Sequence, residues 1–217
     1  MILTNLATFR NTFLTIHKNG LTMNITLLTN QDYQTSEWSG GSTTQLYISP
    51  ANSLYADRNF DFRISSAKVE APESTFTALP GVNRKLMVLE GEVTVNHKDK
   101  YSKTLKPFEI DTFSGDWNTS AKGICTDFNL MTTGNLTSEL SHMQLLANHY
   151  KTLTIEGNYH TVCLYLHSGS IYAEINNKLY NLKKESLLIL NNINIFSFHL
   201  HAHKRSELIV SKIGYKV

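Results

Sequence analysis

A carboxylate, a guanidinium and a hydroxyl alternate with apolar side chains in residues 60–67, which makes this stretch the first candidate for chemistry. The alternation predicts a β-strand, because successive side chains of a strand point to opposite faces of its sheet. One face would carry Asp61, Arg63 and Ser65, and the other face would be apolar and need covering. On a cavity wall, Arg63 would offer a fork of N–H donors to a carboxylate ligand. On the outer surface it would be an ordinary solvated residue, and the alternation alone does not choose between the two.

A second predicted strand, residues 123–131, places Asp127 and Asn129 together on one face. An arginine removed from water needs a partner, and an internal aspartate is the least costly one. Arg63 therefore has two predicted roles, because it either binds a carboxylate ligand or forms a structural salt bridge with Asp127. The two roles are compatible if Asp127 orients the guanidinium toward a ligand.

The composition argues against several classes of protein. The chain has 217 residues and a net charge of +2 at pH 7 with no basic run, so nucleic-acid binding is not expected. No apolar run is long enough to span a bilayer. Cys125 and Cys163 have neither CxxC nor metal-ligand spacing, which suggests buried thiols in a reducing compartment. We therefore expect a soluble cytoplasmic β protein without membrane or nucleic-acid partners.

Regularly spaced short strands, present in both halves of the chain, predict an all-β fold of two small barrels or sandwiches. The strand, glycine turn and strand of residues 86–95 recur in residues 162–172, with Gly91 and Gly169 at the two turns. The predicted division is an N-terminal extension over residues 1–22, an N-terminal barrel over 23–135 and a C-terminal barrel over 136–217.

Local patterns add three expectations. Residues 38–46 contain paired glycines followed by hydroxyls, and they are predicted as a loop, either a tight turn with Trp38 packed on the core or a weak anion site. Residues 47–59 are predicted as an irregular connection. Residues 136–148 suit either a capped helix or a strand.

No catalytic or metal-binding residue is predicted. His199, His201 and His203 alternate and would face one way on a strand, as zinc, iron or nickel ligands can. A basic segment with the character of an exposed turn follows them, so a solvated hairpin tip is the favoured interpretation. Ser65 and Cys125 have no histidine nearby in sequence and no nucleophile-elbow motif. We expect no cofactor.

Five segments, taken in order and with their spacing, resemble the HutD/Ves family. The resemblance covers roughly residues 23–133 and continues more weakly to the end of the chain. It implies a bicupin, with two RmlC-like cupin β-barrels or jelly rolls in one chain. The segments are Trp38–Thr43, Phe62–Ser65, Phe76–Arg84, Leu89–Gly91 and Asp127–Met131.

The resemblance also implies a function. Family members include HutD proteins of bacterial histidine utilisation and Ves proteins described as environmental stress-induced, and the family is generally not regarded as enzymatic. Its HutD branch is thought to bind small acids such as urocanate or formylglutamate and to limit flux through the pathway. We expect a non-enzymatic carboxylate-binding protein, with a homodimer as a possible assembly. Two alternatives are a metal-dependent cupin isomerase or oxygenase, and a protein-interaction module with a vestigial pocket.

The family's functional positions transfer residue by residue. Its two pocket arginines fall on Arg63 and Arg84, its loop hydroxyl on Thr43, and the polar pair of the fifth segment on Asp127 and Asn129. Two departures affect the expected pocket, because Phe62 replaces the family's usual tryptophan and Ser42 replaces a common third glycine. The full set of predicted ligand-binding residues is Arg63, Arg84, Trp38, Thr43, Ser65, Asp127 and Asn129.

Overall fold

The computed structural model describes residues 16–18, 21–193 and 196–216. Most of the predicted N-terminal extension, residues 1–15 and 19–20, lies outside the described residues. The described part of the chain forms 20 β-strands and no helix, so within it there is also no helix suited to crossing a membrane. The prediction of an all-β chain is confirmed.

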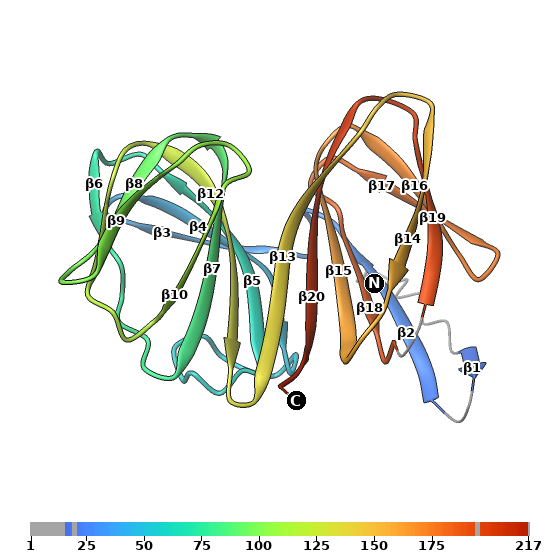
Figure 1. Cartoon of the computed structure of the whole chain (residues 1–217), viewed down its shortest axis with the longest axis horizontal. Coiled ribbons are helices and arrows are strands. Elements are labelled where there is room, and N and C mark those ends of the chain that lie inside the picture. Colours follow the sequence, from blue (N-terminus) through green and yellow to red (C-terminus); the bar gives the residue numbers. More distant parts are fainter. Residues whose placement is uncertain (1–15, 19–20, 194–195, 217) are drawn as a thin grey trace, which may run out of the picture.

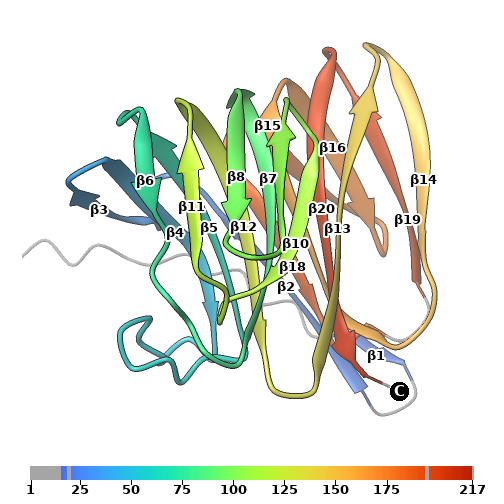
Figure 2. The ribbon, with the colours of Figure 1, turned by 60° about the vertical axis from the view of Figure 1, so that its left-hand side comes forward.

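The first of two units, which Figures 1 and 2 show beside the second, pairs a six-stranded sheet with a four-stranded one. All strand pairs in it are antiparallel. The six-stranded sheet has the order β10 (Ile110–Ser114), β7 (Val82–Gly91), β12 (Cys125–Thr133), β5 (Phe62–Val69), β4 (Gly41–Ser49) and β3 (Gln34–Trp38). The smaller sheet has the order β6 (Glu73–Thr75), β11 (Thr119–Lys122), β8 (Val93–His97) and β9 (Tyr101–Leu105).

The second unit repeats this arrangement of a six-stranded and a four-stranded sheet. Its larger sheet has the order β1 (Ile16–Lys18), β2 (Leu21–Leu28), β18 (Leu187–Asn191), β15 (Tyr159–Ser168), β20 (Ser206–Tyr215) and β13 (Leu136–Leu145). Its smaller sheet has the order β14 (His149–Ile155), β19 (Phe196–Ala202), β16 (Ser170–Ile175) and β17 (Lys178–Lys183).

The position of β2 differs from the prediction. We expected the strand that begins near Met23 to open the N-terminal barrel, but β2 pairs with β18 in the sheet of the second unit. Met23 and Ile25 are buried in the apolar core of that unit, and Leu27 packs against it. The alternating apolar residues of β2 therefore complete the second core, which the sequence pattern could not assign to either barrel.

One local prediction is corrected, and one open alternative is decided. The loop predicted over residues 38–46 is wrong, because β3 and β4 form a hairpin through a turn at Ser39 and Gly40, and β4 extends through Ser49. Hydroxyl-rich residues of β4 pair along β5, as in Thr43 opposite Ala67, so they act as strand residues. For residues 136–148 the structure selects the strand, β13, over the helix.

Four apolar clusters hold the described residues together. One fills the second unit, two lie within the first, and one lies between the two six-stranded sheets. Phe62 and Ile64 belong to the cluster between the sheets. Because side chains alternate along β5, Arg63 and Ser65 point to its opposite face, into the first unit.

The tight approach of β4 to β5 gives a stability prediction. Gly41 has a φ of 144°, and a Cβ there would lie 1.9 Å from the carbonyl oxygen of Lys68. Gly81 also has a positive φ, 77°, but a Cβ there would meet nothing within 4 Å. We expect Gly81→Ala to cost about 1 kcal/mol of unfolding free energy and Gly41→Ala roughly 3 kcal/mol, because only the second adds a backbone collision. Urea denaturation measures both, and equal losses would contradict the prediction.

Candidate functional site

All seven predicted ligand-binding residues line one cavity of about 330 Å³ in the first unit. Its volume lies at the small end of the usual range for small-molecule sites, roughly 300–1,000 Å³. The floor comes from β5, β7 and β12, and the rim comes from β3, β4 and residues 74–77. The alternation in residues 60–67 correctly separated the cavity-facing side chains of β5 from its apolar face.

Strand register brings the polar side chains into rows across the sheet. Met131 of β12 lies opposite both Arg63 of β5 and Arg84 of β7, and Asn129 lies opposite Ser65. Directly opposed residues of antiparallel strands share a face. The two guanidiniums therefore lie on the same side of the sheet, with the amide and hydroxyl in the next row.

Arg63 is 6% exposed, and its partners are neutral. Its Nε donates to Oε1 of Gln45 at 2.8 Å, and its Nη1 donates to the Ser65 hydroxyl at 2.9 Å. The guanidinium lies 4.2 Å from the centre of the Tyr55 ring. Burial lowers the pKa of Arg63. Its positive charge is thus solvated by an amide, a hydroxyl and a ring face.

Arg84 is 7% exposed and has fewer hydrogen bonds than Arg63. Its Nη2 donates to Oδ1 of Asn129 at 3.2 Å, and its buried Nε has no hydrogen-bond partner within the described part of the chain. The guanidinium lies 4.8 Å from the Phe76 ring centre and 5.1 Å from that of Phe113. Burial lowers the pKa of Arg84 as well. An unsatisfied buried donor of a charged group costs free energy unless a ligand supplies the acceptor.

Asp127 is the acidic group of the cavity, but it forms no ion pair with either arginine. Among the ion pairs of residues 16–18, 21–193 and 196–216, none includes Arg63 or Arg84. Instead, Asn129 Nδ2 donates to Oδ1 of Asp127 at 2.6 Å. Burial raises the pKa of Asp127 to about 7, against the lowering effect of Arg84. The structural salt bridge considered for Arg63 and Asp127 is therefore absent among the described residues.

The rim carries Trp38 and Thr43. Trp38 is 39% exposed and its ring lies against Gly40, where an added Cβ would be 2.2 Å from the ring. The alternative in which Trp38 packs as part of the core is therefore not what the structure shows. A glycine at position 40 leaves the indole room to lie beside the cavity mouth.

Three contributors to the site escaped the sequence analysis: Tyr55, Gln45 and Phe76. Tyr55 and Phe76 cover the two guanidiniums, and Gln45 accepts a hydrogen bond from Arg63. Tyr55 lies in an irregular segment without periodicity, so no pattern could have found it. Gln45 falls in the stretch predicted as a loop, and reading that stretch as a strand would have put it beside Ser65, its partner in the register of β4 with β5.

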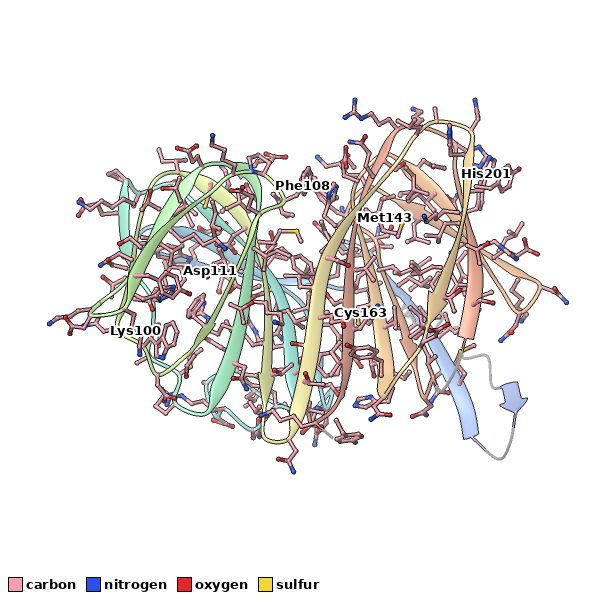
Figure 3. All side chains as sticks on the ribbon, viewed as in Figure 1. Lys100, Phe108, Asp111, Met143, Cys163 and His201 are labelled. Carbon is pink, nitrogen blue, oxygen red and sulfur yellow. The ribbon has the colours of Figure 1, made fainter. Side chains whose placement is uncertain are left out.

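The remaining reactive groups do not join this cavity. His97 is buried and hydrogen-bonds Asp111 at 2.9 Å and Thr119 at 2.9 Å, so its ring nitrogens are satisfied. Burial raises the pKa of Cys125 to about 12 and that of Cys163 well above its usual range. Figure 3 shows Asp111 in the first unit and Cys163 between the two units. These thiols are protonated and inert at neutral pH.

His199 and His201 lie on β19 in the smaller sheet of the second unit, where Figure 3 labels His201, and His203 follows the end of that strand. The His201 ring stacks on Tyr150 at 4.0 Å between ring centres, and the His201 and His203 rings lie 4.5 Å apart. No three His, Cys, Asp or Glu side chains converge as metal ligands in the part of the chain that the structure describes. Metal binding through these histidines gains no support from the geometry.

A family model described as HutD matches residues 30–210. The structure is similar to a conserved protein of unknown function from Pseudomonas aeruginosa PAO1, with 20% identity, a TM-score of 0.76, and coverage of 88% of this chain and 98% of that chain. It is also similar to HutD from Pseudomonas fluorescens SBW25, with 18% identity, a TM-score of 0.68, and coverage of 89% of this chain and 100% of that chain. A third similar structure is YhhW from Escherichia coli, with 13% identity, a TM-score of 0.66, and coverage of 89% of this chain and 98% of that chain. At these identities the solved structures establish the fold, and the predicted bicupin is confirmed.

Proposed function

Because the chain belongs to the HutD family, we propose that it is a non-enzymatic binding protein whose ligand is a small organic carboxylate. Arg63 and Arg84 hold the carboxylate group. Thr43, Ser65 and Asn129 supply neutral hydrogen bonds, Trp38 covers the mouth, and Asp127 orients the network through Asn129.

One observation carries the proposal: two buried guanidiniums face one cavity, and neither has an ion-pair partner among the described residues. A buried charge is costly unless it is paired. The nearby carboxyl, Asp127, is half protonated near neutral pH, since its pKa is about 7. The cavity therefore carries excess positive charge, and a ligand carboxylate compensates it with charge-assisted hydrogen bonds.

The walls favour a ligand with a compact or planar body. Tyr55 and Phe76 each present a ring to a guanidinium, and Trp38 adds a third aromatic surface at the rim. Urocanate and formylglutamate are the candidate acids, because each carries a carboxylate together with further hydrogen-bonding groups and each fits a cavity of about 330 Å³.

The cellular role that we propose is regulation of histidine utilisation in the cytoplasm, with an environmental stress response as the alternative. The family match and the likeness to HutD from Pseudomonas fluorescens support the first role. Two free buried cysteines are typical of a reducing compartment. The described residues contain no group of three or more His, Cys, Asp or Glu side chains that could hold the metal of the isomerase or oxygenase alternative.

A thermal-shift titration tests the proposal. Urocanate or formylglutamate at millimolar concentration is expected to raise the melting temperature, because a ligand that binds only the folded state stabilises it by mass action. The amide of urocanate and the diamide of formylglutamate are matched controls, since they are neutral and lack the carboxylates, and they should produce no such rise. The proposal fails if no carboxylate in a panel that includes these two acids stabilises the protein.

A further inference from the structure

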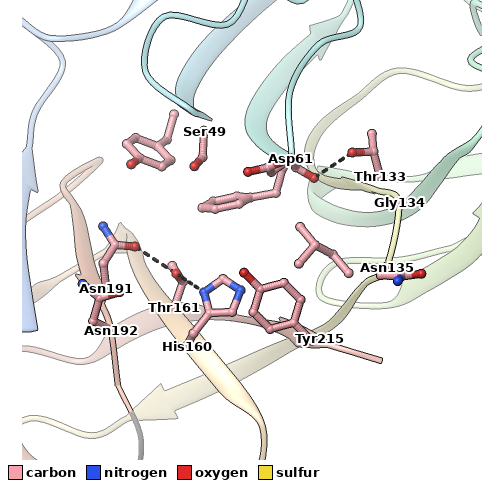
Figure 4. Close-up of a pocket in the computed structure, with 13 residues that line it drawn as sticks. Ser49, Asp61, Thr133, Gly134, Asn135, His160, Thr161, Asn191, Asn192 and Tyr215 are labelled. Atoms are coloured by element: carbon pink, nitrogen blue, oxygen red, sulfur yellow. Dashed lines mark hydrogen bonds between the residues drawn. The ribbon is translucent and has the colours of Figure 1, made fainter. Parts of the chain in front are cut away.

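A second cavity, of about 400 Å³, lies where β12 passes into β13 and the two units meet (Figure 4). Its lining comes from both units, including Asp61 and Phe62 at the start of β5, His160 and Thr161 on β15, and Tyr215 at the end of β20. Strand β5 separates it from the cavity lined by Arg63 and Arg84, called the arginine cavity below. Phe62 of β5 faces the second cavity, and Arg63 faces the arginine cavity. The two cavities share no lining residue.

The hydrogen bonds around His160 define the state of its ring. The Thr161 hydroxyl donates its one proton to Oδ1 of Asn191 at 2.9 Å. It must therefore accept in its second contact, which joins it to His160 Nδ1 at 2.9 Å. Nδ1 thus carries a proton, and burial lowers the pKa of His160, which favours the neutral ring. In this tautomer Nε2 is a bare acceptor.

His160 Nε2 is buried and has no hydrogen-bond partner among the residues that the structure describes. Figure 4 shows the ring between Thr161 and Tyr215, with the dashed hydrogen bonds on the Thr161 side. The Tyr215 ring centre lies 4.7 Å from that of His160, and Tyr215 is 61% exposed. An unpaired buried acceptor carries a desolvation penalty. A ligand that enters beside Tyr215 and donates an N–H to Nε2 removes this penalty.

The cavity has negative character. Asp61 is the one acidic residue among the described residues that line it, and neither lysine nor arginine lines it. The aromatic rings of Tyr47 and Phe62, 5.5 Å apart, add two π surfaces. The negative face of an aromatic ring attracts cations, as the carboxylate does. This charge is opposite to that of the arginine cavity.

We propose that this cavity binds a small organic cation with N–H donors, of the alkylammonium or guanidinium class. One N–H donates to His160 Nε2, the positive charge faces the Asp61 carboxylate, and the apolar part of the ligand packs on Tyr47, Phe62 and Tyr215. The site is independent of carboxylate binding, because it uses neither of the two buried arginines.

Titration of the full chain with benzylamine, which is a cation at neutral pH, tests the site. Calorimetry or NMR should show saturable binding, while benzoate and benzyl alcohol should not bind here. Asp61→Asn is expected to weaken benzylamine binding about tenfold, because it removes one close charge. Glu92→Gln, a change at another exposed acid, and Arg63→Ala should leave the affinity unchanged. Absence of saturable binding at millimolar benzylamine, or equal affinities for the wild type and Asp61→Asn, would overturn the proposal.

The histidine contact has its own test. Long-range ¹H–¹⁵N spectra of the ligand-free protein should show the His160 proton on Nδ1, and benzylamine should shift the Nε2 resonance. His160→Phe keeps the ring but removes the acceptor, and it should weaken benzylamine binding while the response to urocanate stays unchanged. A proton found on Nε2, or full benzylamine affinity in His160→Phe, would contradict the assignment.

Discussion

Arg63→Ala is expected to abolish the stabilisation of the protein by urocanate or formylglutamate. Arg63 is buried on the cavity floor, and its hydrogen-bond partners among the described residues are neutral, so the ligand carboxylate would be its ionic partner. Truncating one member of a buried, hydrogen-bonded charge pair costs about 2–5 kcal/mol, which corresponds to roughly 30-fold or greater loss of affinity. Calorimetric titration of the purified variant measures this loss directly.

Arg205→Ala is the matched control for this experiment. Arg205 has a side chain that is 68% exposed, lies in the second unit and forms only a long ion pair with Glu207 at 3.7 Å. Its removal takes away the same charge but should leave ligand affinity unchanged. Circular dichroism of both variants establishes that they fold. If folded Arg63→Ala keeps its affinity for every acid that binds the wild type, Arg63 does not bind the carboxylate.

Asp127→Asn is expected to stabilise the unliganded protein, and more so at alkaline pH. Burial raises the pKa of Asp127 from 3.8 in its ordinary state to about 7 in the folded protein. The folded state therefore keeps a proton that the unfolded chain releases as the pH rises from about 4 to about 7, and stability falls through this window. Above pH 7 the full cost, on the order of 4 kcal/mol, is present.

Urea denaturation of the wild type and Asp127→Asn at two pH values measures this effect. Asparagine keeps an oxygen that can accept the hydrogen bond from Asn129 Nδ2, but it cannot ionise. The stability advantage of the variant should grow by about 2–3 kcal/mol between pH 5 and pH 8. Asp116→Asn, at an exposed acid, should show no such growth. Parallel pH profiles of wild type and Asp127→Asn would contradict a raised pKa.

The polar row on β5 was predictable, because strand alternation separates Arg63 and Ser65 from Phe62 and Ile64 without any knowledge of the fold. Alternation did not predict which face of β5 lines a cavity. The polar face does so because the apolar face of β5 packs against the six-stranded sheet of the second unit. The association of Arg63 with Arg84 also depends on the register of β5, β12 and β7, which the family resemblance supplied and periodicity did not.

The errors have a common physical cause. Residues 38–46 resemble a loop because of their glycines and hydroxyls, but pairing with β5 outweighs local preference. Strand β2 has an ordinary alternating pattern that fits either barrel, so only its pairing with β18 decides where it lies. Tyr55 contacts Arg63 from an irregular segment, where no period relates sequence to space. Each error concerns tertiary contact, which outweighs the local signal.

The placement of β2 has a consequence for synthesis on the ribosome. This strand precedes every strand of the first unit in the chain, but β18, with which it pairs in the sheet, follows them all. The intervening unit can collapse earlier, since its sheets use strands from β3 to β12 alone. Until β18 has been synthesised, one edge of this apolar strand therefore stays unpaired, and we expect nascent chains of this protein to bind chaperones that shield such segments.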